Sequence, residues 1–199
     1  MKRVLWMVLL TLALPLAAFA GNVDFQSQSG TLTGGTTWMG TEVVNSITGL
    51  GAPLGCASCD LATINFTVTG VGTSAFTGGS FTITADTALP GIASGASIFN
   101  GTFSCGACTV QVITGANGNN LYVLVGQVSG TWYNGTTVSG VTTQTVLNSG
   151  KGLLAGGSGM ITSADTTILT STTPEPGSLM LMGTGLVGLA GALRRKLKA

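Results

Sequence analysis

Two short cysteine motifs are the residues in this sequence with the clearest chemical potential. Each has the form Cys-x-x-Cys, and together they comprise Cys56, Cys59, Cys105 and Cys108. Four thiolates at such spacings bind zinc in a reducing compartment, whereas an oxidising compartment favours disulfides, of which four cysteines allow three pairings. A β-turn brings residues i and i+3 within about 7 Å, so a disulfide inside each motif is sterically feasible. β-forming residues follow both motifs, whereas thioredoxin-type redox sites lie at the start of a helix.

Histidine is absent from the sequence, and arginine is absent between residues 21 and 172. These absences exclude Ser-His-Asp and Cys-His catalysis, histidine-bound metals and arginine clamps on phosphate. A carboxylate pair, as in glycoside hydrolysis, is the catalytic arrangement that remains possible. The acids in this region are Asp24, Glu42, Asp60, Asp86 and Asp165. We predict that Asp60, Asp86 and Asp165 cap turns, and that the protein is not an enzyme and binds no metal or cofactor.

The region between the two ends of the chain, residues 21–172, is long enough for one domain with one core. It is rich in Gly, Thr and Ser, and Lys151 is its single basic residue. Nucleic-acid binding needs clustered Lys and Arg, so that function is excluded. The domain is predicted to be folded rather than disordered, because its charge is too low to keep a chain expanded.

β-branched and aromatic residues recur in blocks bounded by Gly, Asn or Pro, which is typical of strands. The predicted strands are Thr41–Thr48, Leu61–Thr69, Gly79–Ala85, Ser97–Ser104, Thr109–Thr114, Leu121–Tyr133, Thr136–Leu147 and Gly159–Ser163. Short antiparallel strands without crossover helices predict an all-β fold, an antiparallel β-sandwich or jelly roll. The alternative, a solenoid, requires a regular repeat that this sequence lacks.

The strongest local signal is the pair Asn134-Gly135 between two long strand-like runs. This pair is typical of a type I′ hairpin turn, in which both central residues have positive φ. Three glycines inside the hairpin arms, Gly126, Gly130 and Gly140, predict bulges or sharp curvature.

The N-terminus has the three parts of a secretory signal peptide. Lys2 and Arg3 precede an apolar run, and Ala18-Phe19-Ala20 provides the small-x-small cleavage site, with Ala18 and Ala20 as its small residues. The predicted signal peptide helix is therefore residues 1–20, removed by signal peptidase. Because export places the thiols in an oxidising compartment, the predicted pairs are Cys56–Cys59 and Cys105–Cys108, with zinc as the alternative.

The C-terminus also has three parts, and they follow one another directly. Pro174-Glu175-Pro176 precedes an apolar run over residues 178–193. The basic residues that follow this run are Arg194, Arg195, Lys196 and Lys198. The run predicts a short transmembrane helix, and the positive-inside rule keeps the basic end cytoplasmic and the domain outside.

This order of Pro-Glu-Pro, apolar helix and basic end resembles the PEP-CTERM tail, which exosortases recognise in bacteria with an outer membrane. The resemblance covers residues 173–199 and implies that Pro174, Glu175 and Pro176 form the recognition element. It also implies cleavage near that element by exosortase, after a transient tether in the inner membrane. Tails of this type are also catalogued as ice-binding protein C-terminal domains.

The resemblance implies an exported structural protein of the cell surface or of an extracellular, exopolysaccharide-associated biofilm matrix. The alternative is a carbohydrate-binding module, in which Trp38, Trp132 and Tyr133 would stack on sugar rings. Ice binding is a minor alternative, because the Thr-x-Thr pairs of the sequence are irregularly spaced. Two coplanar, exposed rings on one face would favour the sugar-binding hypothesis.

Overall fold

The computed structural model describes residues 21–50, 53–55, 59–115 and 119–170. Within it, Asn22–Thr170 forms one compact unit. Its strands are β1 (Asn22–Thr33), β2 (Thr37–Thr48), β3 (Leu54–Gly55), β4 (Ala62–Thr69), β5 (Ser80–Ala85), β6 (Ser97–Phe103), β7 (Thr109–Thr114), β8 (Asn119–Trp132), β9 (Thr137–Ser149) and β10 (Ser158–Leu169). One 3-10 helix, η1 (Leu153–Ala155), lies between β9 and β10.

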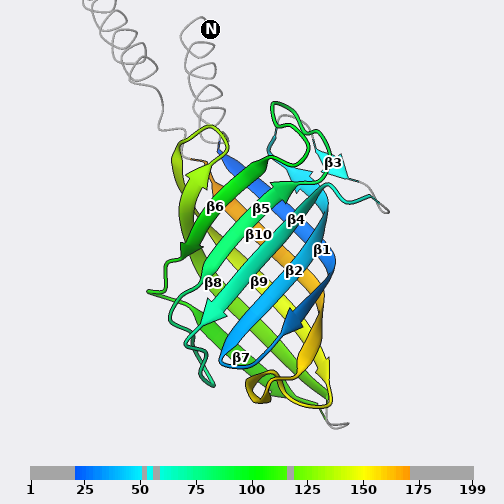
Figure 1. The fold of residues 1–199 in the computed structure, drawn as a ribbon, viewed down its shortest axis with the longest axis vertical. Helices are drawn as coiled ribbons and strands as arrows, with labels where there is room; N and C mark the ends of the chain where they lie inside the picture. Colours follow the sequence, from blue (N-terminus) through cyan, green and yellow to red (C-terminus); the bar gives the residue numbers. More distant parts are fainter. Residues whose placement is uncertain (1–20, 51–52, 56–58, 116–118, 171–199) are drawn as a thin grey trace, which may run out of the picture. The chain divides into compact units, whose positions relative to one another are not determined.

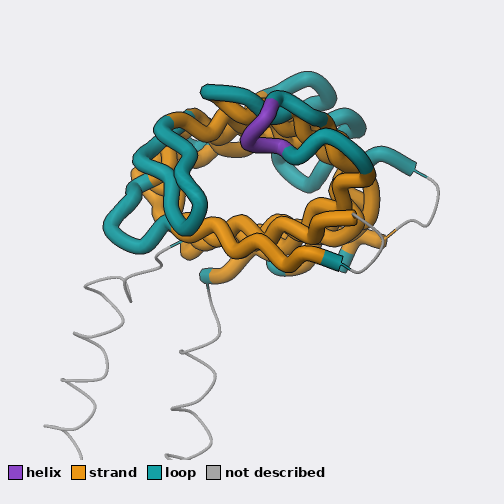
Figure 2. Tube along the Cα trace, turned by 90° about the horizontal axis from the view of Figure 1, so that it is seen from below, coloured by secondary structure: helices purple, strands orange, loops and turns teal. Residues whose placement is uncertain are grey.

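Eight antiparallel strands close into a barrel in the order β1-β10-β9-β8-β6-β5-β4-β2 (Figures 1 and 2). The closing strand is β1, which pairs with β10 along one edge and with β2 along the other. The all-β prediction is confirmed, but the sandwich or jelly roll is wrong. A sandwich needs two sheets with separate edges, and the double pairing of β1 removes those edges.

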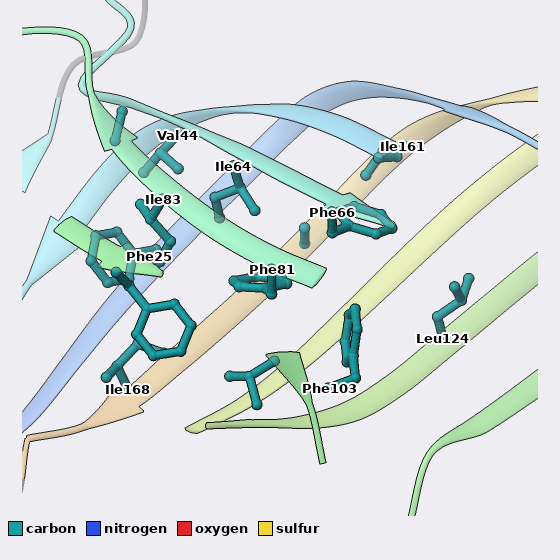
Figure 3. Close-up of a cluster of buried hydrophobic side chains, with 14 of the residues drawn as sticks. Phe25, Val44, Ile64, Phe66, Phe81, Ile83, Phe103, Leu124, Ile161 and Ile168 are labelled. Atoms are coloured by element: carbon teal, nitrogen blue, oxygen red, sulfur yellow. The ribbon is translucent and has the colours of Figure 1, made fainter. Parts of the chain in front are cut away.

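The strands alternate between an apolar inner face and a polar outer face. In β4, for example, Ile64, Phe66 and Val68 are buried, whereas Asn65 and Thr69 are exposed. The buried apolar side chains form one cluster inside the barrel, part of which is drawn in Figure 3. Period-two patterning therefore positions every inward-facing group discussed below.

Strands β6 and β7 lie end to end against the same neighbour, β8. Phe103 pairs with Val128 and Thr109 pairs with Val125, so residues 104–108 form a wide interruption opposite two residues of β8. A Cys105–Cys108 disulfide spans this interruption, with Cα atoms 4.8 Å apart. The motif was predicted at a hairpin tip; it instead joins two parts of one interrupted strand.

The hairpin between β8 and β9 is confirmed, but its turn is not type I′. Among the described residues, positive φ occurs only at glycines, and Gly135 has φ 84° while Asn134 does not share it. The N–H of Gly135 donates to the carbonyl of Trp132 (2.8 Å), which makes a three-residue connection ending in a left-handed glycine. The Asn134 side chain accepts hydrogen bonds from the N–H and the hydroxyl of Thr136.

Two strand glycines, Gly40 and Gly126, make room for inward-facing rings, and the glycines of the hairpin arms cause no bulge between β8 and β9. The register of β8 with β9 runs without a shift past Gly126, Gly130 and Gly140. A Cβ added at Gly126 would lie 2.7 Å from Cδ1 of Phe103, and one at Gly40 would collide with the Phe66 ring. The absence of a side chain at these positions lets aromatic rings pack directly on the strand backbone.

Replacing Gly40 with alanine is expected to destabilise the barrel by about 1–3 kcal/mol, because the Phe66 ring must leave its position. Gly55→Ala is the matched control, since a Cβ there meets nothing within 4 Å. Urea denaturation of both variants measures the difference. Equal stability of Gly40→Ala and the parent would contradict this packing.

The predicted signal peptide helix and transmembrane helix lie outside the described residues. Within the part of the chain that the structure describes, no helix has the length and apolar character needed to cross a membrane.

Candidate functional site

The barrel interior has two chemically different sides. Among the described residues, the buried polar side chains come from the adjacent strands β2, β1, β10 and β9 and form a polar wall: Ser27, Glu42, Thr142, Gln144, Asn148 and Thr166. The adjacent strands β4, β5 and β6 contribute an aromatic wall: Phe66, Phe81, Phe99 and Phe103. Figure 3 shows Phe66, Phe81 and Phe103 pointing into the same interior region.

Glu42 is the ionisable residue of the polar wall. It lies on β2 at an inward position, with Gly40 and Val44 two residues away on the same face. Gly30 of β1 is its paired neighbour on one side and Ile64 of β4 on the other. A Cβ at Gly30 would lie 3.1 Å from Cγ of Glu42, so the glutamate side chain extends over the bare backbone of β1.

The Glu42 carboxyl group has no hydrogen-bond partner at either oxygen, and its side chain is fully buried. Burial raises the pKa of Glu42 from its ordinary value of 4.5 to about 8. The cause is desolvation, which disfavours the charged form when no opposite charge compensates for it. Glu42 is therefore mainly a neutral carboxylic acid at pH 7. A carboxyl group whose pKa is strongly raised is typical of functional sites, and it also occurs as a destabilising residue in a protein core.

The remaining polar wall is hydrogen-bonded in part. The hydroxyls of Thr142 and Thr166 lie 2.7 Å apart, and Nε2 of Gln144 donates to the Thr142 hydroxyl. Asn148 donates to the carbonyls of Lys151 and Ser158. The carbonyl oxygens of the Gln144 and Asn148 side chains stay unpaired, so the wall presents an excess of acceptors toward the interior.

The 3-10 helix η1 lies at the rim of the barrel (Figure 2). Leu153 is fully buried, and its N–H donates to the Tyr122 hydroxyl (3.2 Å). Tyr122 contacts Trp38 edge to face at 5.7 Å between ring centroids. The N–H of Gly35, in the β1–β2 turn, donates to the Leu153 carbonyl (2.9 Å). Both backbone groups of Leu153 are therefore hydrogen-bonded, one to Tyr122 of β8 and one to the β1–β2 turn.

The sugar-stacking hypothesis is wrong for two of its three rings. Trp38 is fully buried and Trp132 is 4% exposed, because both occupy inward positions of their strands. Tyr133 is 44% exposed and lies next to Trp132 in the hairpin turn, with ring planes 56° apart. The pair of coplanar exposed rings that would favour sugar binding is not formed by these residues.

Two carboxyl groups meet on the outer face of β1 and β10. Asp24 accepts hydrogen bonds from Gln26 and Thr167, and Asp165 is paired in register with Gln26. A hydrogen bond with Asp24, followed by burial and by the Asp24 charge, raises the pKa of Asp165 to about 6. Asp165 lies mid-strand, so its predicted role in capping a turn is wrong. The sequence did not indicate this pair because β1 was not among the predicted strands.

The cysteines are oxidised where the structure describes them. Cys105 and Cys108 form a disulfide, and Cys59 is disulfide-bonded, while Cys56 lies outside the described residues. In the described part of the chain, no group of three or more His, Cys, Asp or Glu residues could hold a metal ion. The predicted disulfide between Cys105 and Cys108 is therefore confirmed.

Removing the Cys105–Cys108 disulfide with a double serine substitution is expected to cost at most about 2 kcal/mol, because the closed loop is short. The barrel should remain folded by circular dichroism, with a lower denaturation midpoint. Alkylation before and after reduction, read by mass spectrometry, checks that the thiols are blocked in the parent. Unfolding of the variant would show that the interruption between β6 and β7 needs the bond to form.

The tail residues Pro174, Glu175, Pro176, Arg194, Arg195, Lys196 and Lys198, and the cleavage residues Ala18 and Ala20, lie outside the described residues. The family model of the PEP-CTERM protein-sorting motif matches residues 172–196. The chain carries a PEP-CTERM sorting motif. The motif implies an exported protein that is processed by exosortase. No curated protein and no solved structure matches the chain.

Proposed function

We propose that the protein is a structural component of the cell surface or of an extracellular, exopolysaccharide-associated matrix, sorted there through its PEP-CTERM motif. Signal peptidase removes residues 1–20, and the tail then tethers the domain in the inner membrane until exosortase acts. The observation that carries the proposal is the sorting motif at residues 172–196, directly after the compact unit Asn22–Thr170.

The outer face of the barrel supports this proposal. Its exposed hydroxyl and amide groups bond to one another across strands, as Thr41 does with Asn65 and Thr67 with Ser80. Outward-facing Thr and Ser present many weak hydrogen-bonding groups and little charge, which suits contact with hydrated polysaccharide. The burial of Trp38 and Trp132 counts against a dedicated sugar-stacking site.

Replacing Pro174-Glu175-Pro176 with three alanines is expected to block processing. Proline disfavours a helix interior whereas alanine favours it, so the substitution removes the proposed recognition element and favours helix in its place. The variant should accumulate in the membrane fraction at unprocessed length, whereas the parent should be shorter and recovered outside the inner membrane. Fractionation with mass spectrometry of each fraction measures this.

The parent chain in cells that lack exosortase is the control, and it should behave as the variant does. Equal mass and fractionation of parent and variant in normal cells would contradict processing at this motif. Absence of the processed parent from the isolated matrix and cell surface would contradict the proposed location.

A further inference from the structure

Glu42 has an energetic cost that the structural role does not explain. Its carboxyl group is fully buried, and neither oxygen has a partner. A buried acid without a partner destabilises a fold, and an apolar residue of similar volume would be cheaper. A binding role for the interior accounts for a carboxyl group at this position.

The surroundings of Glu42 join the two walls of the barrel. The Phe66 ring lies on Gly40, the next inward position of the same strand, and it stacks on Phe81 with centroids 6.2 Å apart. The aromatic wall therefore begins directly beside the carboxyl group. On the other side, Gly30 offers no side chain that could cover it.

Gln144 is an inward residue of β9, on the row of paired positions next to the row of Glu42. Val44, the inward neighbour of Glu42, pairs with Ser27, Ser27 pairs with Ala164, and Ala164 pairs with Gln144. This row of paired inward positions leads across small side chains to the unpaired Oε1 of Gln144. Barrels of eight strands are either filled by side chains or hold one small ligand, and the unpaired oxygens of Glu42 and Gln144 favour a ligand here.

We propose that the barrel interior binds a small primary ammonium ion, which donates hydrogen bonds to Glu42 and Gln144 and packs its hydrocarbon part against the aromatic wall.

The chemistry of the unpaired oxygens selects this ligand class. An ionised Glu42 and Oε1 of Gln144 offer only acceptors, and an ammonium group has three donors and no acceptor. Its charge compensates for that of Glu42, and aromatic faces attract cations. Hard metal ions prefer six to eight oxygen ligands, which the aromatic wall does not supply. Anions are repelled by an ionised Glu42.

Glutamate occurs only at positions 42 and 175, which permits a direct test. The full chain, labelled with carbon-13 at the glutamate side-chain carboxyl and purified in non-ionic detergent, gives one titrating signal from each. Methylammonium, butylammonium and 2-phenylethylammonium are added in turn, both to the folded protein and during refolding, so that slow entry cannot hide binding. The alcohol of the same carbon skeleton is the neutral control for each.

At least one ammonium ion is expected to lower the titration midpoint of the Glu42 signal by one pH unit or more, which corresponds to tenfold tighter binding to the ionised form. The matching alcohol should leave it unchanged, and the Glu175 signal should not respond. In equilibrium dialysis, Glu42→Gln should reduce binding at least tenfold, while the exposed-site variant Asp86→Asn should bind as the parent does. An unchanged Glu42 midpoint with every ammonium ion, or equal binding by Glu42→Gln, overturns the proposal.

Discussion

Replacing Glu42 with glutamine is expected to stabilise the barrel at neutral and alkaline pH and to change its stability little near pH 4. Glutamine has almost the same shape but cannot ionise. In the parent, the folded state must either hold a charge without a partner or keep a proton that the unfolded state has released.

The sign follows from the raised pKa of Glu42, about 8 in the folded state against an ordinary value of 4.5. Below pH 4.5 both states are protonated, and Glu42 imposes no ionisation cost. As the pH rises from 4.5 to 8, the unfolded state releases its proton first, so the parent progressively loses stability. At about 1.4 kcal/mol per pH unit, the loss is roughly 3 kcal/mol at pH 7 and grows until about pH 8.

Urea denaturation of the parent and Glu42→Gln from pH 4 to pH 9 measures this difference. Asp165→Asn is the matched control, because the raised pKa of Asp165, about 6, has the same sign but confines its effect to lower pH. The Asp165 variant should have a shallower slope than the parent between about pH 4 and pH 6, where Glu42 still contributes, and the parent's slope above it. Parallel curves for the parent and Glu42→Gln would show that Glu42 is not buried without a partner.

The sequence predicted the strands better than it predicted their closure. All eight predicted segments correspond to strands, namely β2, β4–β9 and the first part of β10. Two strands, β1 and the two-residue β3, were missed. Strand β1 has Val23, Phe25 and Leu32 facing inward, but register shifts between Gln26 and Ser29 interrupt its alternation. Without β1, the remaining strands are compatible with two sheets. Whether a sheet closes depends on pairings between distant segments, which local patterns do not encode.

The candidate site likewise depends partly on local sequence patterns and partly on which distant strands become neighbours. Trp38, Gly40, Glu42 and Val44 alternate with exposed residues, so a strict period of two would have placed Glu42 inside. The strand was instead predicted to begin at Thr41, which separated Glu42 from the apolar series. The separation of polar and aromatic walls depends on which strands are neighbours in the closed barrel, and no local pattern reports that.

Replacing Phe81 with alanine is expected to cost about 3–5 kcal/mol of folding stability, which is a large part of the total for a domain of this size. The Phe81 side chain is fully buried and lies at the centre of the aromatic wall. Its ring centroid is 5.6 Å from that of Phe103, 6.1 Å from that of Phe99 and 6.2 Å from that of Phe66. Removing the Phe81 ring takes away the one partner that the other three rings share. Strand β5 is paired on both sides, with β4 and β6, which limits how far the surrounding side chains can move into the space.

Denaturation of Phe81→Ala, Phe103→Ala and the double variant measures both the cost and the coupling. Because the two rings are in contact, the double variant should lose less stability than the two single variants together. Tyr133→Ala is the control, since that ring is 44% exposed and its loss should change stability by less than about 1 kcal/mol. If the Phe81 and Phe103 costs are small or strictly additive, the rings do not form one packed wall. The interior beside Glu42 would then be open to water, and the unpaired carboxyl group would need no bound cation to explain it.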